Sequence, residues 1–129
     1  MAKQFVVQLK NEPGAMASLA EALAARGVDL RAIGGGSMGD SGHVIMTTAD
    51  DETAGAVLDE GGYVYIEGDS ILAEVDDKPG GMARLSRALA DAGVNIHGHL
   101  FLGRWGDRAM FTFVVDKPEI ARPILERKD

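Results

Sequence analysis

The sequence contains no cysteine, and this absence excludes several kinds of chemistry. Without thiols the chain cannot form disulfides, bind a metal through thiolates or use a cysteine nucleophile. A chain without disulfides suits a reducing compartment, and we expect a cytoplasmic protein. Proline and aromatic residues are also scarce, with 4 prolines and 5% aromatics in 129 residues. Hydrophobic residues nevertheless make up 46% of the chain, which is enough for a folded core.

The sequence also lacks long apolar runs and has fewer basic than acidic residues. No stretch approaches the roughly 20 apolar residues that a membrane-spanning helix requires, and residues 1–14 do not resemble a signal peptide. Residues 1–68 carry four Lys/Arg against ten Asp/Glu, within a whole-chain charge of −7. An acidic surface repels phosphate backbones. We therefore expect partners that include neither a membrane nor nucleic acid.

The most informative feature of the sequence is an internal repeat. The stretch from Asn11 to Leu30 returns as Asp77 to Ile96, at an offset of 66 residues. Between Pro13 and Leu30, ten of eighteen positions are identical in the second copy. Repeats of this kind must be identified before the fold is assigned. The repeat predicts two modules of the same structure.

Periodicity and turn residues predict the order βαββαβ for the first module, residues 1–68. Strands are expected at 4–9, 28–38, 43–48 and 63–67, and helices at 13–26 and 51–60. Asn11 is expected to cap the first helix, with Pro13 in its first turn. This order is the split βαβ, or ferredoxin-like, arrangement. The fold class is therefore α+β, with antiparallel sheets and helices on one face.

The second module, residues 69–129, follows without a flexible linker. Strands are expected at 71–75, 94–103 and 109–115, and helices at 79–93 and 118–128. Pro123 should bend or shorten the last helix. Nothing corresponds to the strand at 63–67, so the second module lacks its fourth strand. The strand at 71–75 is then an open edge, and we expect another chain or segment to cover it.

The repeated strand–helix junction is the candidate functional loop. A glycine there allows close approach of a ligand, and the first helical turn offers free N–H groups that suit a carboxylate. Asn11 can both donate and accept hydrogen bonds, whereas Asp77 can only accept and suits an ammonium group. Alternatively, Asn11 and Asp77 act only as helix caps.

Together, these features resemble the ACT domain. The resemblance lies in a strand, an Asn/Asp-x-Pro-Gly turn, a Met-Ala-x-Leu helix and a closing Gly-Val-Asn/Asp-Ile/Leu, and it covers two tandem copies. ACT domains are small βαββαβ regulatory modules that typically bind amino acids where two such domains meet. The resemblance implies a ligand-binding set in both copies: Asn11, Glu12, Pro13, Gly14, Ala15, Met16 and Asp29, and Asp77, Lys78, Pro79, Gly80, Gly81, Met82 and Asn95.

What the resemblance implies for function is a free-standing, non-catalytic amino-acid sensor, expected as a homodimer. The two loops differ, with Asn11 against Asp77 and Glu12 against Lys78, so we expect either that at most one loop binds tightly or that the two bind in different orientations. The alternative is a regulatory subunit that acts by contact with a biosynthetic enzyme. No Ser-His-Asp order or close carboxylate pair points to catalysis, and we predict neither catalytic residues nor a cofactor.

Two further motifs allow other interpretations. His97 and His99 alternate in an expected strand and, with His43, could form a metal site, but such histidines are more often surface residues, so we predict no metal. The alternation also places Ile96, Leu100 and Leu102 on one face and His97, His99 and Phe101 on the other. Gly34–Gly36 lacks the Lys-Ser/Thr ending of a phosphate loop. It indicates close packing or a distorted edge strand, where two modules meet.

Overall fold

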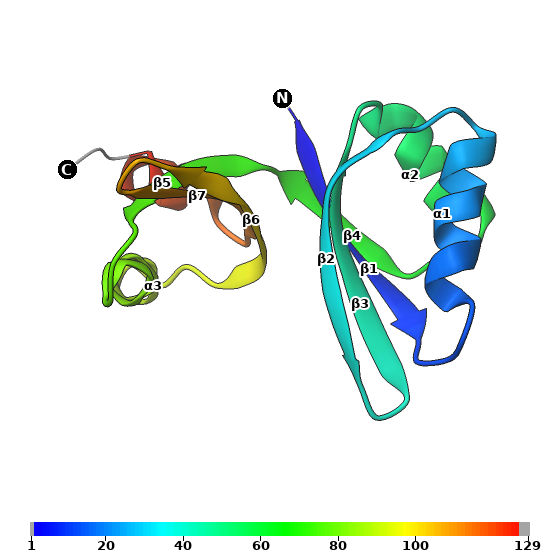
Figure 1. Ribbon diagram of the computed structural model, residues 1–129, viewed down its shortest axis with the longest axis horizontal. Coiled ribbons are helices and arrows are strands. Elements are labelled where there is room, and N and C mark those ends of the chain that lie inside the picture. Colours follow the sequence, from blue (N-terminus) through cyan, green and yellow to red (C-terminus); the bar gives the residue numbers. More distant parts are fainter. Residues whose placement is uncertain (1, 127–129) are drawn as a thin grey trace. The chain divides into compact units, whose positions relative to one another are not determined.

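The computed structural model describes residues 2–126, which form two compact units (Figure 1). The first module, Ala2–Glu67, contains β1 (Lys3–Lys10), α1 (Ala15–Ala25), β2 (Leu30–Met38), β3 (Ser41–Thr48), α2 (Asp51–Glu60) and the start of β4 (Tyr65–Asp69). The second module, from Gly68 onward, contains β5 (Ile71–Asp76), α3 (Gly81–Asp91), β6 (Ile96–Trp105), β7 (Arg108–Val115) and α4 (Pro118–Leu125). The predicted α+β class is confirmed.

In the first module a four-stranded sheet has the order β2-β3-β1-β4, and α1 and α2 cover one of its faces (Figure 1). Alternate residues of β1 and β3 point toward the helices, as the apolar alternation predicts. The core consists of Phe5, Val7, Leu19, Leu23, Val28, Val44, Met46, Ala54, Val57 and Leu58. These contacts fix α1 over the sheet, and β2 is left as an edge strand beside it.

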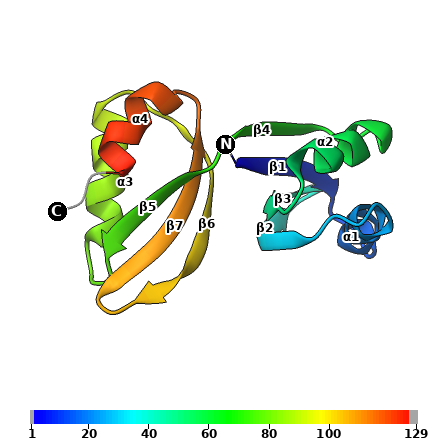
Figure 2. The same cartoon turned by 90° about the horizontal axis from the view of Figure 1, so that it is seen from above.

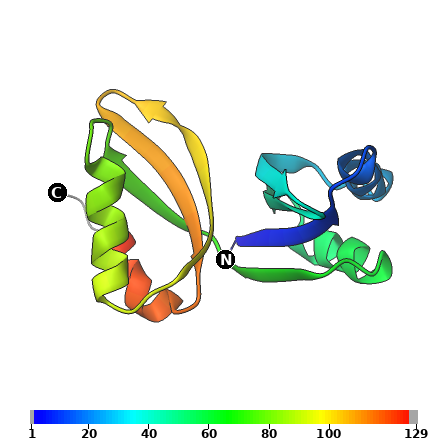
Figure 3. The ribbon, with the colours of Figure 1, turned by 90° about the horizontal axis from the view of Figure 1, so that it is seen from below.

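In the second module a three-stranded sheet has the order β5-β7-β6. Helices α3 and α4 cover one face of it (Figures 2 and 3). Its core consists of Ile71, Ala73, Leu89, Val94, Phe113, Val115, Ala121 and Leu125. Among residues 2–126, β5 pairs only with β7, so no fourth strand is present in the described part of this sheet. Coverage of the β5 edge by another chain or segment stays a prediction.

The helices α1 and α3 begin later than the sequence pattern predicted. The N-cap positions are Gly14 and Gly80, with φ of 88° and 93°, and neither helix has a side-chain cap. The predicted cap at Asn11 and the placement of Pro13 in the first turn were therefore wrong. Glycine adopts this left-handed backbone without strain, which explains why the glycine recurs in both copies.

Strand β6 does not alternate as predicted. Its pairing with β7 shifts between Ile96 and Gly98 and again between Phe101 and Gly103. Each shift adds a residue to one strand and changes which face the next side chains occupy. Ile96 lies opposite Val115 and Leu100 opposite Thr112, so these two residues occupy opposite faces of the sheet.

Helix α2 begins with acidic residues. Asp50 is the N-cap and accepts a hydrogen bond from the backbone N–H of Thr53, at 3.1 Å. Hydrogen bonds from the side chain and backbone of Thr53 lower the pKa of the Asp50 carboxyl. In α4 the helix contains Pro123 and ends at Leu125; its predicted end at residue 128 lies outside the described residues. None of the helices in the described chain is long and apolar enough to cross a membrane.

Tyr65 gives the first module a measurable pH response. Its hydroxyl donates a 2.7 Å hydrogen bond to Asp59 Oδ1, which raises the pKa of Tyr65 to about 12 from 10.0. Because the folded pKa is raised, this contribution to stability is complete below about pH 10 and is lost as the pH rises toward 12. In a Tyr63→Phe background, we expect Asp59→Asn to move the tyrosinate absorbance titration of Tyr65 back toward 10. An unchanged titration would contradict this assignment.

Candidate ligand site at the first strand–helix loop

The loop between β1 and α1 is tied to the turn between β2 and β3. The backbone N–H of Asn11 donates to Asp40 O at 3.1 Å, and Asn11 Nδ2 donates to Gly39 O at 2.9 Å. The side chain of Asn11 therefore positions the loop instead of capping the helix. The loop and the turn form one end of the module, and cavities lie on both sides of the loop.

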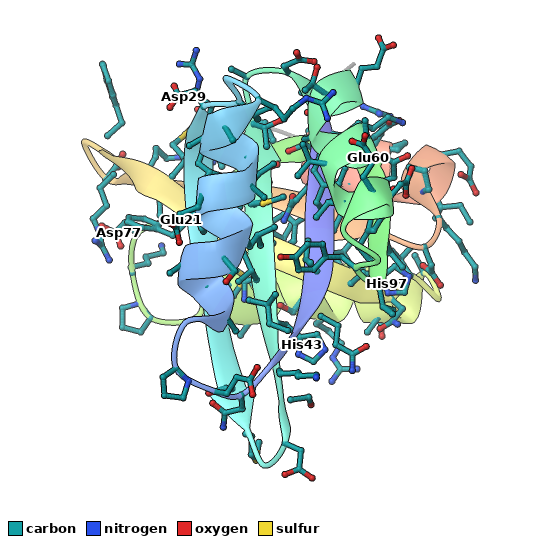
Figure 4. The ribbon with its side chains drawn as sticks, turned by 90° about the vertical axis from the view of Figure 1, so that its right-hand side faces the viewer. Glu21, Asp29, His43, Glu60, Asp77 and His97 are labelled. Carbon is teal, nitrogen blue, oxygen red and sulfur yellow. The ribbon has the colours of Figure 1, made fainter. Side chains whose placement is uncertain are left out.

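The first cavity, which we call the β2 groove, lies between α1 and the edge strand β2 and has a volume of about 420 Å³. It contains four of the residues predicted from the sequence: Asn11, Glu12, Ala15 and Met16. The β2 side consists largely of Ile33 and Gly34–Gly36. Without side chains at the three glycines, the backbone of the edge strand itself forms the wall. His43, which also lines the groove, is labelled in Figure 4.

The second cavity, which we call the β4 pocket, lies on the other side of the loop and has a volume of about 500 Å³. It extends from the end of β1 to the segment between α2 and β4. Its lining comprises Gln8, Leu9, Lys10, Glu12, Ala15, Ser18, Asp40, Ser41, Gly61, Gly62, Tyr63 and Val64. The β4 pocket and the β2 groove share Leu9, Lys10, Glu12 and Ala15. Both cavities therefore depend on the same loop.

The corresponding loop of the second module is filled by its own side chains. Arg104 Nε lies 2.8 Å from Asp77 Oδ2, and Asp76 pairs with both Arg84 and Arg108. The nitrogen Lys78 Nζ lies 3.9 Å from Asp76 Oδ2. The cavity beside these groups has a volume of only about 140 Å³. The carboxylate that the sequence offered to an ammonium ligand is already paired with Arg104.

Three substitutions between the copies account for this difference. At equivalent positions the first module has Lys10, Ser18 and Ser41, and the second has Asp76, Arg84 and Arg108. In the second module the guanidinium groups of Arg84 and Arg108 pair with the carboxylate of Asp76 and occupy the space beside the loop. In the first module two short hydroxyl side chains leave that space open. Among the described residues, the first loop is therefore the one with large cavities beside it.

The structure does not bring every predicted residue to the loops. Pro13 and Gly14 shape the first loop but line neither cavity. Asp29 lies beyond the far end of α1, as Figure 4 shows, and its carbonyl accepts from Ala49 N–H. Asn95 holds the equivalent place in the second module, where its N–H donates to Asp116 Oδ1 at 2.8 Å. Within one module, therefore, neither residue lies beside the Pro-Gly loop.

In the second copy Pro79, Gly80, Gly81 and Met82 lie in or next to the closed loop. Gly81 borders the small cavity, and Met82 packs against the module core. A side chain at Gly80 would meet the Arg84 guanidinium at 3.0 Å. These residues serve the packing of the loop in the described structure.

Sequence reasoning missed Lys10 and Tyr63 as lining residues, whereas it interpreted the glycines of β2 as a place of close packing. The Gly34–Gly36 run was the available signal, because glycine in an edge strand marks close approach of another backbone or ligand. In the described chain, no three His, Asp or Glu side chains are grouped to hold a metal ion. The ring of His99 instead stacks beside Phe113, with centroids 6.2 Å apart.

A family model decides what the second module is. The model of the ACT domain matches residues 70–127. These residues belong to the ACT domain family. The first module carries the same repeated motif and the same order of elements, completed by β4. No curated protein matches the chain.

Solved structures share the fold of this chain over nearly its whole length. A protein from Bacteroides thetaiotaomicron matches with a TM-score of 0.73 and 21% identity, covering 97% of this chain and 86% of that one. The regulatory subunit of aspartate kinase from Thermus thermophilus matches with a TM-score of 0.61 and 21% identity, covering 97% and 89%. The regulatory subunit of aspartate kinase from Thermus flavus matches with a TM-score of 0.64 and 18% identity, covering 97% of this chain and 90% of that one. These similarities establish the fold.

Proposed function

We propose that the chain is a non-catalytic regulatory protein that binds an amino acid in the β2 groove, completed by an ACT module of a second copy. The observation that carries this proposal is the contrast between the two loops. The first is flanked by open cavities, whereas arginines fill the second. The ligand is then expected at Asn11, Glu12, Ala15 and Met16 of the first module.

The chemistry of the groove suits an α-amino acid. The first turn of α1 has no side-chain cap, so backbone N–H groups at its start can receive a carboxylate. Glu12 can pair with an ammonium group, and the half-exposed Met16 and Ile33 can contact an apolar side chain. A zwitterion would thus satisfy both polar ends of the groove.

The edge position of β2 supports completion by a second copy. Its outer side has no strand partner among the described residues, and Gly34–Gly36 permit close approach of another backbone. Antiparallel pairing of two β2 strands would place Asp29 of one copy beside the β1–α1 loop of the other. This arrangement gives Asp29 the place opposite the ligand that the family resemblance implies. A ligand contacting both copies would shift the equilibrium between them.

The second candidate is a regulatory subunit whose main contact is with a biosynthetic enzyme. Two of the structural neighbours are regulatory subunits of aspartate kinase, which makes this class of partner worth testing. A thermal-shift screen with the standard amino acids separates the candidates, because a ligand of the folded state raises stability with concentration. No shift, together with co-purification of an enzyme, would favour this second candidate, and a shift only with divalent metals would point to a metal-responsive module.

Met16→Glu is expected to weaken binding of the amino acid by about tenfold or more, equivalent to about 1.4 kcal/mol. The new carboxylate lies in the groove and repels that of the ligand. Ala17→Glu is the matched control, since Ala17 is the next residue of α1, is exposed and lines neither cavity. Isothermal titration calorimetry measures both affinities, and analytical ultracentrifugation follows association. Equal affinities for the two variants would place the ligand elsewhere.

A further inference from the structure

The β4 pocket is separate from the β2 groove and has its own walls. Ser18 on α1, Ser41 at the start of β3 and the segment from Gly61 to Val64 line the β4 pocket and not the groove. Its volume of about 500 Å³ is in the range of small-molecule sites. The proposed function does not use this pocket.

The charges around the β4 pocket have no partners within the described structure. Lys10, Glu12 and Asp40 line it, and none of the three takes part in an ion pair among residues 2–126. In the second module, by contrast, Lys10 and Glu12 are replaced by Asp76 and Lys78. These two pair with each other, and Asp76 also pairs with Arg84 and Arg108. The first module leaves one cation and two carboxylates for an external partner.

The second module fills this place with its own side chains. There the guanidinium of Arg84 reaches from the helix toward Asp76, with Nη2 3.4 Å from Oδ2. The equivalent position on α1 is Ser18, so the same space in the first module holds no guanidinium. Carboxylates at Glu12 and Asp40 border the vacated space and can accept charge-assisted hydrogen bonds.

We propose that the β4 pocket is a second small-molecule site and that it takes a basic amino acid. The carboxylate of the ligand pairs with Lys10, while its ammonium and side-chain cation pair with Glu12 and Asp40. A ligand of net charge +1 balances the charge of −1 on these three lining residues. The net charge of −6 on residues 1–68 also attracts a cationic compound. This proposal does not depend on the amino acid proposed for the β2 groove.

L-arginine is the probe, and two analogues separate its charges. Citrulline has nearly the same shape but no side-chain cation, and agmatine has no carboxylate. In calorimetric titrations of the full chain, we expect each analogue to bind about tenfold or more weakly than arginine, since each lacks one charge-assisted contact. Citrulline or agmatine binding as tightly as arginine would overturn the proposal, as would the absence of arginine binding.

Ser18→Arg tests the location by supplying the missing guanidinium from the protein. We expect this variant to lose arginine binding by about tenfold or more, while Ala17→Arg, with the same added charge one residue away, stays within about twofold. Met16→Glu in the β2 groove should also leave arginine binding within about twofold, which separates failure of this site from failure of the proposed function. If Ser18→Arg does not fold by circular dichroism, Asp40→Asn replaces it. Unchanged binding in the folded variant would overturn the site.

Discussion

Gly81→Ala is expected to destabilise the second module by about 3 kcal/mol, near the upper end for overpacked positions. A Cβ atom at Gly81 would lie 2.2 Å from the carbonyl oxygen of Asp76 and 3.3 Å from its carbonyl carbon. Both are backbone atoms of β5, so no flexible side chain can move aside. The start of α3 would have to shift away from the sheet. Urea unfolding followed by circular dichroism measures the loss.

Gly36→Ala is the matched control for this substitution. A Cβ atom there has no neighbour within 4 Å, and the backbone of Gly36 is not in the left-handed region. Its unfolding free energy should stay within about 0.5 kcal/mol of the original chain. The first module already has Ala15 at the position equivalent to Gly81. The close approach of the start of α3 to the backbone of β5 is therefore specific to the second copy. Equal stability of the two variants would contradict the close approach of Gly81 to the backbone of Asp76.

Leu23→Ala and Leu89→Ala should each cost about 2–5 kcal/mol, because each removes most of a buried side chain and leaves a cavity. The two leucines occupy equivalent positions in α1 and α3, and both are 0% exposed. Hydrogen exchange read by mass spectrometry locates the effect. We expect faster exchange in α1 and its sheet for the first variant and in α3 and its sheet for the second.

Leu72→Ala provides the comparison, since Leu72 is 50% exposed and already contacts water. Its cost should remain below about 1 kcal/mol, because little apolar area returns to solvent. A loss at Leu89 no larger than the loss at Leu72 would show that α3 does not pack on the sheet as described.

The order of elements could be predicted because each depends on local pattern. Alternation identified β1 and β5, and the apolar stripe identified α1 and α3, since both periods are set by backbone geometry. The helix starts could not be placed so well. Asn11 is a residue type that often caps helices, yet its side chain donates a hydrogen bond to the carbonyl of Gly39, 28 residues later in the chain. Contacts of that range are not contained in a local window.

The candidate site was only partly predictable for the same reason. Asn11, Glu12, Ala15 and Met16 were identified from one loop, and all four line the β2 groove. The closure of the second loop depends on Arg104, which comes from a strand that shifts register twice. A residue added to a strand moves later side chains to the other face, and alternation alone cannot show where this occurs.

The charged filling of the second loop also makes it sensitive to ionic strength. Its pairs between arginines and the carboxylates of Asp76 and Asp77 are largely solvent-accessible. Dissolved salt screens such pairs over distances of about 8 Å at physiological concentration. The first loop is instead tied down by hydrogen bonds to a neighbouring turn, which salt hardly weakens. Raising the salt concentration should therefore make the loop between β5 and α3 more mobile and leave the loop between β1 and α1 rigid.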